Sequence, residues 1–87
     1  MRQIAVIIPA YNEGKTIRKI VQRVLLHCKH VIVVDDGSND ETSAAIKDLP
    51  VVLLHNKVNQ GKAVSLWKGI QTALKAGVSE VITLDAD

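Results

Sequence analysis

The 87-residue chain has no phenylalanine, and it has only one tryptophan, one tyrosine and one cysteine. A lone cysteine excludes an intrachain disulfide, and the shortage of aromatic side chains means that an aliphatic core must form from valine, isoleucine and leucine. No apolar run approaches the roughly 18 residues of a membrane-spanning helix. A formal net charge of +2 is too small to indicate a nucleic-acid or membrane-surface partner.

The N-terminal residues lack the layout of a secretory signal peptide, because Pro9, Asn12 and Glu13 interrupt the first apolar stretch. We therefore expect a cytoplasmic protein that binds no nucleic acid. The length fits a single domain spanning residues 1–87.

Four short apolar runs predict β-strands at residues 3–9, 30–35, 51–54 and 81–85. The runs are nearly continuous in apolar residues and do not alternate with polar ones. Such strands are buried on both faces, as in a parallel sheet.

Helical patterns fill the intervals between these strands. Residues 15–28 place apolar side chains on one face. Residues 38–49 begin with a capping-box spacing of Ser38 and Glu41 and end at Pro50. Residues 62–76 carry an apolar stripe that includes Trp67, which we expect in the core, and end at Gly77.

The alternation predicts an α/β fold, a doubly wound, Rossmann-like parallel sheet of four strands with three helices. We expect strand order 3-2-1-4, with the switch point between the first and fourth strands. Ligands of such sheets bind beyond the carboxyl ends of the strands, near the switch point. Polar clusters occur at three strand ends, at residues 9–13, 35–40 and 85–87, and a fourth opens the third helix at residues 59–62.

Each cluster has a chemical interpretation. Asp85 and Asp87 can share one hard divalent cation, which would bridge diphosphate oxygens. Asp36 can accept from a base N–H, and Asp35 from a ribose hydroxyl or a backbone N–H. Gly37 and Ser38 suit a turn and a helix cap. Beyond these carboxylates, Lys62 at a helix N-terminus forms an anion site, and Tyr11 can stack on a base or ribose.

Together, residues 8–13, 33–42, 59–63 and 84–87 resemble, in order and spacing, the motifs of the family-2 glycosyltransferases with the GT-A fold. Within that family the chain is most similar to polyprenyl-phosphate sugar transferases. Ala63 is a mild departure, since glycine often follows the lysine of the third motif.

The resemblance implies binding of a nucleotide-diphospho-sugar, a UDP- or GDP-sugar, with Mg²⁺ or Mn²⁺, for transfer with inversion. The implied contacts are Pro9, Tyr11 and Glu13 to the nucleoside, Asp36 to the base with Asp35 nearby, Lys62 to base or diphosphate, and Asp85 and Asp87 to the metal, Asp85 also contacting the donor. The family's catalytic base and acceptor region lie beyond Asp87, so we predict no catalytic residue here. We expect a truncated GT-A fold that binds donor, is incomplete for catalysis, and self-associates through the exposed fourth strand.

Other interpretations are weaker or remain open. A P-loop would need glycine where Pro9 stands. A receiver-type phosphoacceptor domain carries its acidic pair after the first strand, and here the pair follows the second. A non-catalytic module that binds nucleotide or associates with itself stays an alternative.

Overall fold

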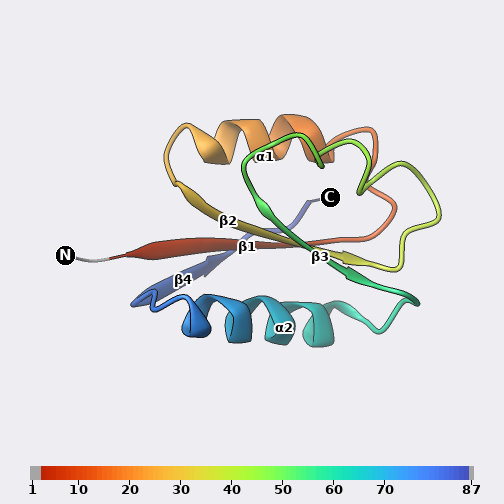
Figure 1. The fold of residues 1–87 in the computed structure, drawn as a ribbon. Helices are drawn as coiled ribbons and strands as arrows, with labels where there is room; N and C mark the ends of the chain where they lie inside the picture. Colours follow the sequence, from red (N-terminus) through yellow and green to blue (C-terminus); the bar gives the residue numbers. More distant parts are fainter. Residues whose placement is uncertain (1–2, 87) are drawn as a thin grey trace.

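The structure is a computed structural model that describes residues 3–86. The elements, in chain order, are β1 (Ile4–Ala10), α1 (Ile17–Leu25), β2 (His30–Asp36), β3 (Val52–Asn56), α2 (Lys62–Lys75) and β4 (Glu80–Thr83). Figure 1 shows the two helices on opposite faces of one sheet.

The four strands form a sheet in the order β3-β2-β1-β4. Every neighbouring pair is parallel, and Val6 of β1 lies between Val31 of β2 and Ile82 of β4. The predicted α/β class, strand order and switch point are therefore confirmed. The parallel arrangement brings all four carboxyl ends to one edge of the sheet, where the polar clusters were predicted to meet.

Two apolar clusters cover the two faces of the sheet. On β1, Val6 and Ile8 point toward α1, while Ala5 and Ile7 pack on the α2 side. Adjacent residues of a strand point to opposite faces, so a strand buried on both faces needs an unbroken apolar run. This requirement explains why strands were recognisable from continuous apolar stretches.

The structure has two helices in the described range, and the prediction of three was wrong. Residues 42–48 form successive turns with one helical i to i+4 bond, from Ala45 N to Glu41 O at 2.8 Å. The predicted capping box does not form, because the Ser38 hydroxyl accepts from the backbone N–H of Asn12 instead, at 2.8 Å. Long-range bonds to the neighbouring loop thus replace the local bonds that a helix start requires.

Trp67 is 58% exposed, so its predicted place in the core was wrong. Helix α2 instead buries a stripe of small residues, Ser65, Gly69 and Ala73. A Cβ on Gly69 would lie 2.4 Å from Cγ2 of Ile7. Small residues let the helix approach the sheet closely, and this close approach leaves the larger side chains of the helix outside.

Strand β4 pairs only with β1 among the described strands, so its other edge is open within residues 3–86. Ile82 is 52% exposed near this edge. Within residues 3–86, neither helix has the length and apolar character needed to cross a membrane.

Candidate functional site

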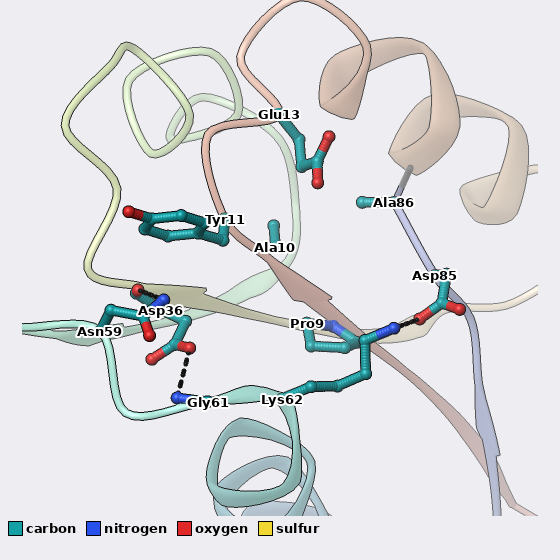
Figure 2. Close-up of a pocket in the computed structure, with 10 residues that line it drawn as sticks. All are labelled: Pro9, Ala10, Tyr11, Glu13, Asp36, Asn59, Gly61, Lys62, Asp85 and Ala86. Atoms are coloured by element: carbon teal, nitrogen blue, oxygen red, sulfur yellow. Dashed lines mark hydrogen bonds and ion pairs between the residues drawn. The ribbon is translucent and has the colours of Figure 1, made fainter.

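A cavity of about 400 Å³ opens at the carboxyl ends of the strands. Its lining comes from the end of β1 and the loop after it, the end of β2, the loop before α2 with the first residue of that helix, and the segment after β4 (Figure 2). The lining residues are Pro9, Ala10, Tyr11, Glu13, Asp36, Asn59, Gly61, Lys62, Asp85 and Ala86. Four polar clusters that are distant in the sequence therefore share one cavity.

Most of the predicted site residues line this cavity, with two exceptions. Asp35 is buried and lies outside the lining. Asp87 lies outside the described residues. The structure consequently brings together Pro9, Tyr11, Glu13, Asp36, Lys62 and Asp85.

Asp36 holds the loop that precedes α2. Its Oδ1 accepts from the backbone N–H of Gln60 at 2.7 Å and from Asn56 Nδ2 at 2.9 Å, and its Oδ2 accepts from the backbone N–H of Gly61 at 2.9 Å. Burial acts to raise the pKa of Asp36, but the hydrogen bonds from Gln60, Asn56, Gly61 and Ser65 lower it overall. The carboxylate is thus a charged anchor at the N-terminus of α2, where a negative charge is favourable.

Asp35 anchors the loop that follows β2. Its Oδ1 accepts from the backbone N–H of Ser38 at 3.0 Å, and its Oδ2 accepts from the hydroxyl of Ser43. An interaction with a backbone N–H was one of the two predicted alternatives for Asp35. The side chain is only 1% exposed, so its observed contacts are within the protein.

The β1–α1 loop carries Tyr11 and Glu13, and Asn12 joins it to the loop after β2. Asn12 has a left-handed backbone, φ 54°, which asparagine tolerates better than most residues. Its N–H donates to the Ser38 hydroxyl, and its Oδ1 accepts from the N–H of Asn39, both at 2.8 Å. This reciprocal pair fixes the loop at the point where Tyr11 projects into the cavity (Figure 2).

Two further bonds hold the same loop beside Glu13. The Glu13 N–H donates to the Thr42 hydroxyl at 2.9 Å, and the Gly14 N–H donates to Asp40 Oδ2 at 3.1 Å. The hydroxyl of Thr42 also donates to Asp40, and this bond is the largest cause of the lowered pKa of Asp40. Residues 40–42, which do not form the predicted helix, therefore support one wall of the cavity.

Lys62 and Asp85 form an ion pair across the cavity mouth, with 2.7 Å between Nζ and Oδ1. Both side chains are 57% exposed, so solvent screens the pair and its contribution to folding is small. Figure 2 shows this pair apart from Tyr11 and Asp36. The cavity therefore has one end with Tyr11 and Asp36 and another end with the Lys62–Asp85 ion pair.

The metal prediction rests on Asp85 alone within the described range. No group of three or more histidine, cysteine, aspartate or glutamate side chains gathers there in a metal-binding arrangement. Asp85 nevertheless offers the carboxylate oxygens that hard divalent cations prefer, and it is exposed on the cavity. One of these oxygens faces Lys62, so a cation at Asp85 would compete with the ammonium group.

Two supporting residues, Asn56 and Asn59, were missed by reasoning from the sequence. Asn59 donates to the backbone oxygen of Asp36 at 3.2 Å, and the buried Asn56 contacts the carboxylate of the same residue. Asn59 lies in a recognised motif, so its involvement could have been predicted. Asn56 ends a strand that was expected to stop at residue 54, and no local signal marks it.

Comparison with known proteins supports the assignment made from the motifs. A family profile described as Glycosyl transferase family 2 matches residues 5–87. The polyprenol monophosphomannose synthase of Mycolicibacterium smegmatis is 36% identical over 90 residues, with 94% of this chain and 34% of that protein covered.

Two more glycosyltransferase relatives support the same family assignment. The UDP-N-acetylglucosamine–dolichyl-phosphate N-acetylglucosaminyltransferase of Methanococcus voltae is 31% identical over 102 residues, covering 97% of this chain and 41% of that protein. The glucosyl-3-phosphoglycerate synthase of Mycobacterium tuberculosis, crystallised with Mn²⁺, UDP-glucose and phosphoglyceric acid, superimposes with a TM-score of 0.75. It is 28% identical and covers 99% of this chain and 34% of that one. The chain thus spans between about a third and two fifths of the length of these relatives.

Proposed function

Because the chain belongs to glycosyl transferase family 2, we propose that its cavity binds the nucleotide-diphospho-sugar donor of a sugar transfer. The observation that carries the proposal is the convergence of Tyr11, Asp36, Lys62 and Asp85 on one cavity at the carboxyl edge of the sheet. The cavity volume of about 400 Å³ lies in the range of small-molecule sites, roughly 300–1,000 Å³.

The two ends of the cavity suit the two ends of such a donor. Tyr11 is 43% exposed beside Pro9, so its ring is available to stack on a base or ribose. Glu13, on the same loop, would accept from nucleoside hydroxyl groups. Lys62, at the first position of α2, would bind the diphosphate with help from the helix N-terminus.

A divalent cation, Mg²⁺ or Mn²⁺, would be held by Asp85, and we assign Asp87 to the same ion. The crystallised mycobacterial relative contains Mn²⁺ with UDP-glucose. When bound, the ion would neutralise diphosphate charge and stabilise the leaving group. Lys62 now faces Asp85, and a diphosphate would offer this ammonium group another anionic partner, leaving the carboxylate for the cation.

Asp36 lies at the cavity, but backbone and amide donors already occupy both of its oxygens. We therefore propose that Asp36 contributes a remaining lone pair to the base N–H while it holds the loop. Activation of the acceptor needs a general base, and we assign no residue of this chain to that role.

Isothermal titration with UDP-glucose and GDP-mannose, each with and without Mn²⁺, tests the proposal. We expect one of the two to bind, with tighter binding when Mn²⁺ is present. The Lys62→Met and Asp85→Asn variants should weaken binding, whereas Lys47→Met should not, because Lys47 is exposed and lies outside the cavity lining. No heat of binding for either donor in the presence of Mn²⁺ would refute the proposal.

A second candidate function, self-association, is favoured by the open edge of β4. Ile82 of β4 and Leu84 just after it are 52% and 39% exposed, and the unpaired edge of a strand is a template for pairing with another strand. We propose a second copy of the chain as the partner. Sedimentation equilibrium should show a mass that rises with concentration and returns to the monomer value in Ile82→Lys, and a constant monomer mass refutes the idea.

A further inference from the structure

A chain of hydrogen bonds leads from the half-buried Lys68 of α2, which lies outside the cavity, through the buried Asn56 to Asp36. Lys68 Nζ donates to Asn56 Oδ1 at 2.5 Å, and Asn56 Nδ2 donates to Asp36 Oδ1 at 2.9 Å and to Ser65 Oγ at 3.2 Å. Asn56, Asp36 and Ser65 are at most 4% exposed. Neither Lys68 nor Asn56 lines the cavity; both line a separate surface hollow beside β3 and α2.

The direction of these bonds follows from the chemistry of Lys68. An ammonium group can only donate, so the amide oxygen of Asn56 must face Lys68. The amide nitrogen is then turned toward the carboxylate of Asp36, the orientation in which it can donate. Without Lys68, the buried amide oxygen of Asn56 would lose its charged donor, and the carboxylate of Asp36 alone would select this orientation.

Asp36, whose carboxylate is held by Asn56, in turn holds the loop before α2. Two consecutive backbone N–H groups, those of Gln60 and Gly61, donate to its two oxygens. Gly37 packs against the same loop so closely that a Cβ there would lie 2.4 Å from the backbone nitrogen of Asn59. The backbone that leads directly into Lys62 is therefore held from β2.

Helix α2 is attached to the ends of β2 and β3 on both sides of Lys62. Asp36 holds the two residues before it, and Asn56 contacts Ser65 and Lys68 in the first two turns after it. The position of the Lys62 backbone, and so the reach of its ammonium group toward Asp85, depends on both attachments.

We propose that Lys68 is a positioning residue, which acts through Asn56 and Asp36 to place Lys62 at the diphosphate end of the donor site. This inference rests on the proposed donor binding, but its structural part, the ordering of the loop before α2, is independent of any ligand. Residues that support a site in this way affect affinity by about 10- to 100-fold in metal sites.

The test compares Lys68→Met, Lys68→Arg and a control, Lys75→Met, on the same helix and lining the same hollow. Amide hydrogen exchange, followed by NMR, reports on the N–H groups of Gln60 and Gly61. Titration with UDP-glucose and Mn²⁺ reports on the site. In Lys68→Met we expect faster exchange at these two amides, unchanged exchange in β1 and β2, and affinity lower by about tenfold.

The controls separate positioning from general stability. Lys68→Arg should restore both readouts, because a guanidinium also only donates, and Lys75→Met should match the wild type. Asn56→Asp keeps an acceptor for Lys68 but cannot donate to Asp36, so it should behave like Lys68→Met or worse.

Two outcomes overturn the inference. The first is unchanged exchange at Gln60 and Gly61 in Lys68→Met, and the second is a uniform acceleration that includes β1 and β2, because Lys68 would then act on the whole fold. If the wild type binds no donor, the proposed function fails, while the exchange data still decide whether Lys68 orders the loop.

Discussion

Asp36→Asn is the substitution that most directly tests the structural role of the acidic pair. Asparagine preserves the shape of the side chain but replaces one oxygen with an NH₂ group. Because Gln60 and Gly61 donate to different oxygens of Asp36, either orientation of the new amide leaves at least one backbone N–H facing another donor.

The size of the effect follows from these contacts. A buried donor without a partner costs about 1–3 kcal/mol, and the remaining bonds lose the strengthening that a charged acceptor provides, so we expect a total of about 2–4 kcal/mol. A domain of this length has a stability of roughly 4–13 kcal/mol. With a urea dependence of about 1–2 kcal/mol per molar, the unfolding midpoint should fall by roughly 2 M.

The loss of stability in Asp36→Asn should depend on pH in a defined direction. The hydrogen bonds lower the pKa of Asp36 below its ordinary value of 3.8, so the ionised side chain contributes stability above that pH. This contribution disappears as the pH falls from 3.8 through the lower pKa of the folded state. The gap between wild type and Asp36→Asn should therefore be full at pH 7 and narrow below pH 3.8.

Urea unfolding followed by far-UV circular dichroism, repeated across this pH range, measures both effects. Asp48→Asn is the control, because Asp48 also has a lowered pKa from its hydrogen bond to Arg18 but lies on the surface. We expect the midpoint of Asp48→Asn to stay near that of the wild type. Equal midpoints for the two variants at pH 7 would refute the anchoring role of Asp36.

Four more substitutions test the packing. Gly37→Ala should destabilise the fold by about 3 kcal/mol or more, because φ is +75° and a Cβ would lie 2.4 Å from backbone. Gly61→Ala, at φ +100° but with open space around the Cβ, should cost only about 1–2 kcal/mol. Equal urea midpoints for the two variants would contradict this difference. Gly69→Ala should lower the melting temperature through contact with Ile7, and a higher value would mean that helix propensity prevails. Trp67→Ala should cost less than about 1 kcal/mol, not the 3–5 of a core position, as equilibrium unfolding can show.

The strand pattern and the location of the site were predictable from residue order alone. Apolar runs such as residues 30–35 indicate strands that are buried on both faces, because neighbouring side chains of a strand point in opposite directions. The strand order β3-β2-β1-β4 then follows from general rules for parallel sheets. Residues at strand ends, including Tyr11, Asp36 and Asp85, share a cavity for the same reason.

The helices were harder to predict, because their evidence is local and long-range bonds can replace it. Ser38 has the sequence context of a helix cap, yet its hydroxyl accepts from Asn12, 26 residues away. In α2, the apolar stripe containing Trp67 indicated a buried face, but burial followed the small residues around Gly69. Hydrophobic periodicity ranks side chains by apolar area, whereas close packing on a sheet selects them by size.

The sequence by itself determined the sheet, its order and the carboxyl edge where acidic and basic groups meet, since these depend on periodicities within each segment. Only the tertiary structure decided which groups the carboxylates of Asp35 and Asp36 contact. It also decided that Asn56 donates to Asp36 and accepts from Lys68. The physical reason is that a hydrogen bond requires donor and acceptor within about 3 Å and well aligned. Asn56 and Gly61, which are 20 and 25 positions from Asp36 in the chain, meet this condition only after the sheet has formed.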